Sequence, residues 1–588
     1  MLIRTRPSCV LILAIVALAS EAAPAQDRAV KPDNVVKPDN APPALAPEGF
    51  RAHLSAAHIA AVNRPRRIYA NNDVGIGLGI DLKPWLSFRF DLFDEPGMQV
   101  DTIAWCLDEG NIAAYPSKVI PVLQYPGLQK WLAEGIDIVK VLVDETHKRD
   151  KEVFWVHRLN GKDANSDFSG GEASPLKKQH PEWLLDSVSW GGEWNFAVPE
   201  VRAHKVAVLR ELAENYDFDG IDIDFSRYPP NLPVGHQWEN REAMTDFMRQ
   251  VRQAFLEVAA RRGRPLLLAA RLPESVAGCH YDGIDIETWT RENLLDIIGV
   301  GGRSIDLDIA GYRRVIGGRN IKLMPSLDAA HPTEGYHHPD IEFWRGVYGN
   351  WWHQGIDGAQ TFNFLSVSNR TFDQAQEAFM RYIQQEAPTL GGLPRTPDYQ
   401  QQALREIGDP KTMRYKDAVY VLQRRYGQFA NPWNSYHNAN SQAPLPVALP
   451  AGNASILSLY VGDDLNANAD RIASVRMRML LTGVKPQIGA SRSADVIEAK
   501  LNGILLPAPV QMYGSAKNLN PHMHDSDTKF PHLGRRLDSP DTWHVFTLKP
   551  QYFAVGENLI SIRLANWSSG ALCSVIVEKL EVSVDYKE

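Results

Sequence analysis

Two aspartates on one face of a buried strand are the feature that most constrains the fold of this 588-residue chain. The segment Asp219-Gly-Ile-Asp-Ile-Asp-Phe-Ser-Arg-Tyr-Pro229 has the pattern of a short, fully buried strand. Side chains alternate along a strand, so Asp222 and Asp224 point to the same side, about 6 to 7 Å apart. A buried carboxylate without a partner costs several kcal/mol. Both groups therefore need a partner, water in a cleft, or a chemical role, and the pair indicates an active site.

The residues before this strand predict a helix. Pro199 suits the first helical position. Val201, Val206, Leu209 and Leu212 follow it at helical spacing. A helix followed at once by a buried strand is half of a βαβ unit, so the sequence predicts a parallel sheet.

Apolar runs of the same kind recur along the chain, and each ends in polar residues. Eight strands that alternate with helices predict an α/β fold, a (β/α)8 TIM barrel, whose active site lies at the C-terminal ends of its strands. Asp224 is then expected at the end of the fourth strand. The predicted strands are 101–107, 152–157, 194–198, 220–225, 265–271, 296–300, 321–327 and 357–364.

From about residue 445 the apolar periodicity changes from helical to alternating. Val475, Met477 and Met479 alternate with Arg476 and Arg478, and residues 560–564 and 580–586 repeat the pattern. This predicts a C-terminal antiparallel β-sandwich domain, which binds sugars or, as we favour, supports the barrel. The expected domains are a signal peptide (1–25), a proline-rich linker (26–48), the catalytic barrel (49–390), a junction (391–444) and the β-sandwich accessory domain (445–588).

The first residues have the pattern of an export signal. Arg4 and Arg6 precede an apolar run at 9–19, and small residues follow at 23–25. This pattern predicts a cleaved secretory signal, so we expect an exported protein, periplasmic or extracellular. No other apolar run approaches the length of about 20 residues that a membrane span requires.

Charge and cysteine content exclude several classes of partner. With 62 basic and 70 acidic residues, the chain has a formal charge of −8, which argues against nucleic acid. One of the four cysteines, Cys9, lies in the apolar run at the start of the chain. The other three are widely spaced and predict buried free thiols, not a disulfide framework or a zinc site. Asp464, Asn466, Asn468 and Asp470 resemble a calcium loop but lack its glycine and glutamate, so they predict a turn. We expect no metal and no cofactor. The sequence leaves the oligomeric state open.

The run Trp194-Asn-Phe-Ala-Val-Pro-Glu-Val-Arg202, followed by Asp219–Pro229, carries a family resemblance. It resembles the glycosyl hydrolase-like family 10 barrels of bacteria, a group of secreted glycosidases. In that family a Pro-Glu-Val-Arg helix precedes an Asp-Gly-Ile-x-x-Asp strand that ends in Arg-Tyr-Pro. The resemblance implies a TIM barrel that acts on a carbohydrate, without naming the sugar. The strand also resembles that of family 18 chitinases, but Ser226 replaces their catalytic glutamate, so chitinase chemistry is not expected.

Most glycosidases use two carboxyl groups that flank the scissile bond. Asp224 matches the acidic position of the family motif and is the first candidate, as nucleophile or base. Glu274 and Asp328 follow the fifth and seventh predicted strands and rank nearly equal as the acid. Asp222 lies deeper and is expected to tune the pKa of its neighbour, because like charges in one site push one of the two pKa values up.

Each site residue also has a structural interpretation. An ion pair with Arg227 or Arg271 is the alternative role for Asp222 and Asp224. Polar residues near strand ends can bond sugar hydroxyls, and tryptophan rings can stack on a pyranose, but loop and core roles are as common. The expected substrate-binding residues are Arg227, Tyr228, His157, Arg158, Arg271, Arg303, Asn363, Trp194, Trp351 and Trp352.

Three functions are compatible with these features. The first is a secreted glycoside hydrolase that cleaves a poly- or oligosaccharide by paired-carboxylate catalysis. The second is a barrel that binds carbohydrate without cleaving it. The third is a metal-assisted hydrolase or lyase, which the lack of a His-x-His pair near the predicted strand ends disfavours. Glycan retention without release of reducing ends would identify the second function, and sensitivity to a chelator the third.

Overall fold

The computed structural model describes residues 50–587 outside the following ranges, which are 74–79, 108–109, 161–173, 186–191, 228, 303, 329–335, 337–338, 387–395, 424–443, 451, 484–495, 514–528, 531–534, 537–541 and 567–574. The expected signal peptide and linker, Tyr228 and Arg303 lie outside the described residues. In the described part, no helix is long and apolar enough to cross a bilayer.

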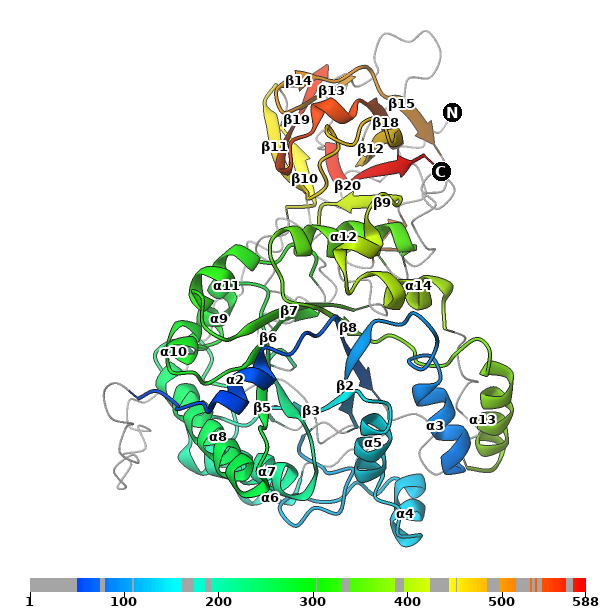
Figure 1. The fold of residues 1–588 in the computed structure, drawn as a ribbon. Helices are drawn as coiled ribbons and strands as arrows, with labels where there is room; N and C mark the ends of the chain where they lie inside the picture. The colour runs from blue at the N-terminus through cyan, green and yellow to red at the C-terminus, as the bar shows by residue number, and fades with distance from the viewer. Residues whose placement is uncertain are drawn as a thin grey trace, which may run out of the picture.

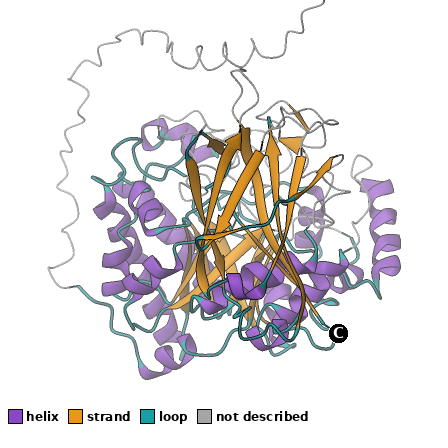
Figure 2. Cartoon of the chain, turned by 90° about the horizontal axis from the view of Figure 1, so that it is seen from above, coloured by secondary structure: helices purple, strands orange, loops and turns teal. Residues whose placement is uncertain are grey.

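Eight parallel strands close into a barrel in sequence order, which confirms the predicted fold class. Figure 2 shows the strands at the centre with helices around them. The strands are β1 (Ile68–Asp73), β2 (Val100–Cys106), β3 (Glu152–Arg158), β4 (Gly220–Asp224), β5 (Leu267–Leu272), β6 (Ile297–Gly302), β7 (Lys322–Asp328) and β8 (Ala359–Phe362).

Helices connect and surround these strands. The predicted helix before β4 is present, and it begins at the proline as expected. The helices are α2 (Ala56–Val62), α3 (Leu82–Phe90), α4 (Pro126–Ala133), α5 (Ile138–His147), α6 (Pro175–Gln179), α7 (Pro199–Asn215), α8 (Arg241–Arg262), α9 (Val276–Tyr281), α10 (Ile286–Arg291), α11 (Ile309–Ile316), α12 (Ile341–His353), α13 (Phe372–Glu386), α14 (Asp398–Glu406) and α15 (Pro410–Met413).

The strand prediction was wrong at two places. Residues 194–198 form no barrel strand and instead lead into α7. The first strand is β1, whose Asn71 and Asn72 are poor strand formers and hid it in the sequence. The two errors compensate in the count, so Asp224 does lie on the fourth strand and Asp328 on the seventh.

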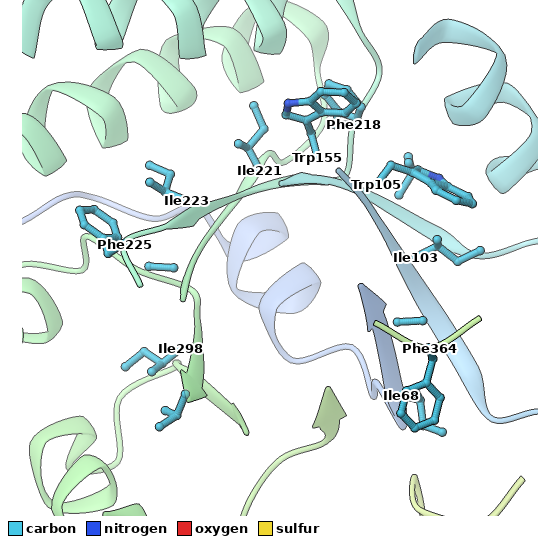
Figure 3. Packing of buried hydrophobic residues seen from close by; sticks show 14 of the residues in the cluster. Ile68, Ile103, Trp105, Trp155, Phe218, Ile221, Ile223, Phe225, Ile298 and Phe364 are labelled. Atoms are coloured by element: carbon cyan, nitrogen blue, oxygen red, sulfur yellow. The ribbon is translucent and has the colours of Figure 1, made fainter. Parts of the chain in front are cut away.

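Alternation along the strands separates two sets of buried side chains. One set points outward and packs under the helices, as Figure 3 shows for Trp105, Trp155, Ile221 and Ile223. The other set points into the barrel, where Val62 of α2 joins it from the N-terminal end of the strands. The inward cluster consists of Val62, Tyr69, Ala104, Cys106, Phe154, Val156, Leu267, Ala269, Ile297 and Met324.

The C-terminal part contains two antiparallel sheets whose inner faces share one apolar core, as expected for a sandwich. Strand β9 (Ala418–Val421), from the expected junction, pairs with β20. The strands are β9, β10 (Val447–Leu449), β11 (Ala454–Val461), β12 (Ile472–Thr482), β13 (Val496–Leu501), β14 (Ile504–Leu505), β15 (Val510–Tyr513), β18 (Thr542–Leu548), β19 (Gly556–Asn566) and β20 (Val575–Tyr586), with a separate pair β16 (Lys529–Phe530) and β17 (Arg535–Arg536).

Helix α12 and strand β9 lie side by side where the barrel meets the second domain (Figure 1). Gly346 makes this close approach possible, because a Cβ there would lie 2.0 Å from the carbonyl oxygen of Val419. Gly349, one turn later in the same helix, has no atom within 4 Å of a Cβ built on it. The two glycines therefore differ in what a side chain would meet.

We predict that Gly346→Ala lowers the melting temperature of the protein and that Gly349→Ala does not. The first substitution forces α12 away from β9, a strain of about 1–3 kcal/mol. The second improves helix propensity by up to about 1 kcal/mol. Differential scanning calorimetry of both variants checks this. Equal melting temperatures for the two variants would contradict the close packing of α12 on β9.

Candidate active site

Asp224 ends β4 and is held by the turn that follows it. Its Oδ1 accepts hydrogen bonds from the backbone N–H groups of Ser226 and Arg227, both at 3.0 Å. An aspartate that binds the backbone two and three residues on fixes its own side-chain direction. The carboxylate, 2% exposed, is thereby oriented at the C-terminal end of the barrel.

Arg271 on β5 is the cation nearest to both aspartates. Its Nη1 lies 3.4 Å from Oδ2 of Asp224, and its Nη2 lies 4.0 Å from Oδ2 of Asp222. The guanidinium also stands over the ring of Phe362, with Cζ 4.7 Å from the ring centroid. The arginine is 1% exposed, so these contacts lie inside the barrel and connect β4, β5 and β8.

Asp222 lies two residues before Asp224 on β4, deeper in the barrel. The Tyr69 hydroxyl donates to its Oδ2 at 3.2 Å. Burial raises the pKa of Asp222 to about 6, and the charge of Asp224 adds to this rise. Arg271 and the hydrogen bonds from Tyr69 and Gln360 lower that pKa in part. The raised pKa favours the protonated form of Asp222 beside Asp224.

Asp328 ends β7 and faces the same interior. Met324 belongs to the inward cluster, and alternation from it places Ser326 and Asp328 on the inward side. Asp328 pairs in register with Phe362, the residue under the Arg271 guanidinium. The Asn363 side-chain amide donates to Oδ2 of Asp328 at 2.9 Å. Asn363 adopts a left-handed backbone, with φ of 57°, to make this contact just after β8.

Glu274 follows β5 but lies toward the helix layer. The Ser304 hydroxyl donates to its Oε1 at 3.0 Å. Burial raises the pKa of Glu274 to about 7. Its charge acts on Cys279 of α9 and on Tyr312 of α11. The glutamate can hold a proton near neutral pH, but its side chain bonds Ser304, whereas Asp224 bonds the backbone of the next turn and Arg271.

Several expected substrate contacts are buried elsewhere. His157 is 1% exposed and faces α7, and burial, helped by Lys205 and His204, holds its pKa well below the usual range. Trp194 donates its indole N–H to Asn111. Trp351, on α12, donates to the carbonyl of Ile305. All three residues are thus buried, with 1% to 2% of their surface exposed.

The remaining expected contacts occupy different places. Arg158 ends β3 and pairs with Asp73 at the end of β1, at 2.8 Å, so it does lie at the mouth. Arg227 is half-buried in the turn after Asp224. Trp352 is half-buried near the second domain and donates to the carbonyl of Ile407. It lies outside this site.

Sequence reasoning missed Tyr69, Gln360 and Phe362, which complete the surroundings of the acidic pair. Tyr69 belongs to the strand that was not predicted. The signal was partial, because Tyr69 and Asn71 alternate with Ile68 and Ala70, but Asn72 interrupts the apolar pattern before Asp73. Gln360 and Phe362 lie two apart on β8 and share a face in the same way.

Comparison with known proteins places this barrel near the glycosidases. Residues 91–254 match the family model described as Glycosyl hydrolase-like 10, which confirms the resemblance seen in the sequence. Glycosyl hydrolase YngK of Bacillus subtilis (strain 168) is 26% identical over 120 residues. That match covers 20% of this chain and 23% of the relative, so the chain spans under a quarter of that relative's length. The matches support a glycosidase.

Solved structures with a related fold include alpha-L-fucosidase isoenzyme 2 from Paenibacillus thiaminolyticus, with a TM-score of 0.37 and 13% identity over 55% of this chain and 50% of that one. The PgaB (BpsB) glycoside hydrolase domain from Bordetella bronchiseptica has a TM-score of 0.38 and 12% identity over 54% of this chain and 98% of that one. Both TM-scores are below 0.5, so the barrel is established by its own strand pairing.

We predict that Glu274→Gln stabilises the protein increasingly as pH rises. The pKa of Glu274 is about 7 in the folded protein and near 4.5 when exposed. Its protonated form therefore contributes stability that is complete below pH 4.5 and is lost as pH rises through about 7. Glutamine keeps the bond to Ser304 and does not titrate. The melting-temperature difference between variant and wild type should grow from pH 5 to pH 8.5, and a constant difference would contradict a buried Glu274.

Proposed function

We propose that this protein is a glycosidase that hydrolyses a poly- or oligosaccharide at the mouth of its barrel, with Asp224 and Asp328 as its carboxyl pair. The observation that carries the proposal is the Arg271 contact. This guanidinium lies 3.4 Å from Asp224 and stands over Phe362, the register partner of Asp328. The two carboxyl groups thus face one interior from β4 and β7, as paired-carboxylate chemistry requires.

Asp224 is the better candidate for nucleophile or base. Two backbone donors fix one of its oxygens, and the other faces Arg271. A fixed carboxylate is what an attacking group or a water-activating group needs, because misplacement by about 1 Å can cost two orders of magnitude in rate. Asp328, held by Asn363, is the candidate acid.

Glu274 is the alternative acid. Its pKa of about 7 suits a group that must deliver a proton at neutral pH. Its side chain, however, accepts a hydrogen bond from Ser304, and its charge acts on Cys279 of α9 and Tyr312 of α11, whereas Asp224 faces Arg271. We therefore rank it below Asp328.

The proposed reaction uses side chains alone. Among the described residues, no group of three or more His, Cys, Asp or Glu side chains is arranged to hold a metal ion. We further propose that the protein acts outside the cytoplasm, because residues 1–25 have the pattern of a secretory signal.

A non-catalytic barrel is the second candidate function. The backbone bonds and the ion pair of Asp224 are also what a purely structural aspartate would show. Measurement of activity separates the two roles.

We predict that Asp224→Asn and Asp328→Asn each lower the release of reducing ends from a hydrolysed polysaccharide by about 10²- to 10⁴-fold. Glu274→Gln is the matched carboxyl-to-amide control. It should retain activity within about tenfold at pH 6, because loss of the general acid would cost about 10²-fold or more and we assign that role to Asp328. A reducing-sugar assay on purified variants with matched circular dichroism spectra checks this. Full activity in Asp224→Asn would refute the pair, and a large loss in Glu274→Gln alone would move the acid role there.

A further inference from the structure

A pocket lies between α12 and the second domain, away from the barrel mouth. It has a volume of about 340 Å³, within the range of about 300–1,000 Å³ that small-molecule sites occupy. Its walls come from the last turns of α12, from the α15 region and β9, and from the turn after β11. In Figure 1, α12 lies where the barrel meets the C-terminal domain, beside β9, a strand of that domain.

The pocket and the candidate active site face opposite ends of the barrel. The C-terminal end of α12 leads into the start of β8, whereas Asp224 and Asp328 stand at strand ends. Gly408, just before α15, packs against Ile68 and Gln99, which lie at the starts of β1 and β2. A ligand in this pocket therefore does not occupy the active site.

Gly349 keeps one wall of the pocket bare. Glycine inside a helix costs about 1 kcal/mol relative to alanine. Gly346 in the same helix has a packing reason, because the Val419 carbonyl oxygen occupies the place of a Cβ. Gly349 has no such reason, since a Cβ there would meet nothing within 4 Å. The helix backbone is left open to the pocket, as happens where a ligand approaches closely.

Tyr415 on the facing wall carries backbone strain. Its φ is 60°, a left-handed conformation that is rare for a bulky side chain. Residues in such conformations cluster at ligand sites, where the surroundings hold them in place. Arg414 and Arg471 stand over the Tyr415 ring at 4.5 and 4.4 Å, and the ring of Tyr586 meets it edge-on. Strain and an unfilled helix position thus occur at one pocket.

The lining combines an aromatic surface with polar groups of both signs. Trp352 is half-buried with its indole N–H already bonded to Ile407. At the rim, Arg414 and Asp464 are exposed, and Asn468 is half-buried. One oxygen of Asp464 accepts the Ala467 N–H within its own turn, which fixes the carboxylate.

We propose that this pocket binds an uncharged oligosaccharide segment, as an anchoring site for the polymer that the barrel hydrolyses. Sugar hydroxyls donate to carboxylates and accept from guanidinium groups, so they can use Arg414 and Asp464 together. A cationic ligand would be repelled by Arg414 and an anionic ligand by Asp464, so the pair favours an uncharged ligand. The C–H face of a pyranose fits an aromatic ring such as that of Trp352. The ligand class rests on the proposed glycosidase function.

The test is affinity electrophoresis through gels that contain laminarin, dextran, soluble starch, hydroxyethyl cellulose or xylan. The Asp224→Asn variant is the background, so that the polymer is not degraded during the run. At least one polymer should retard this protein. Gly349→Trp added to it should weaken the apparent affinity at least fivefold by filling the pocket, whereas Gly349→Ala should stay within twofold.

Arg414→Gln, at an exposed position, is a second variant that keeps the test decisive if Gly349→Trp does not fold. It should weaken retardation at least twofold. Retardation by none of the five polymers, or equal retardation of the Gly349→Trp and Gly349→Ala proteins, would overturn the inference. The proposed function fails separately, because it depends on Asp224-dependent release of reducing ends. Retention that depends on Gly349, without any release, would leave the pocket standing and the catalytic proposal refuted.

Discussion

A buried arginine inside the barrel is the constraint on which the site depends. Arg271 is 1% exposed, and a charge so far from water needs compensation by partners of opposite charge. Asp222 and Asp224 supply it from β4, and the Phe362 ring adds its electron-rich face from β8. The same arginine makes two neighbouring aspartates tolerable in an apolar barrel. Strands β4, β5 and β8 are therefore fixed relative to each other by electrostatics as well as by the barrel's strand pairing.

This arrangement also divides the site between two parts of the chain. The family match at residues 91–254 includes α7 and β4, and hence Asp222 and Asp224. Arg271, Glu274, Asp328 and Phe362 all lie beyond it. The matched segment thus brings the acidic pair, and the later strands bring the cation and the candidate acid. A chemical role for Asp224 has to be argued from this chain's own strands β5, β7 and β8.

The sequence predicted the barrel well because buried parallel strands have a strong apolar signal. It failed at β1, where Asn71 and Asn72 are both buried, on opposite faces of the strand. It also failed at residues 194–198, where the apolar residues belong to a loop in which the Trp194 indole N–H donates to Asn111. Asp224 and Asp328 could be nominated because strand ends mark a barrel's mouth. Local patterns do not encode tertiary packing, so the sequence did not show which tryptophans lie in the core. For the same reason it did not show that Glu274 lies near enough to α9 and α11 for its charge to act on Cys279 and Tyr312.

In the proposed site, Asp224 and Asp328 flank the bond that is cleaved. The most direct measurement is a crystal structure of the Asp224→Asn variant with a bound oligosaccharide of the hydrolysed polymer. We expect a glycosidic oxygen within hydrogen-bond distance of Asp328, with the sugar ring beside position 224 and Arg271 unmoved. A sugar bound at the mouth with Glu274 on the glycosidic oxygen, or with no ring near position 224, would contradict it.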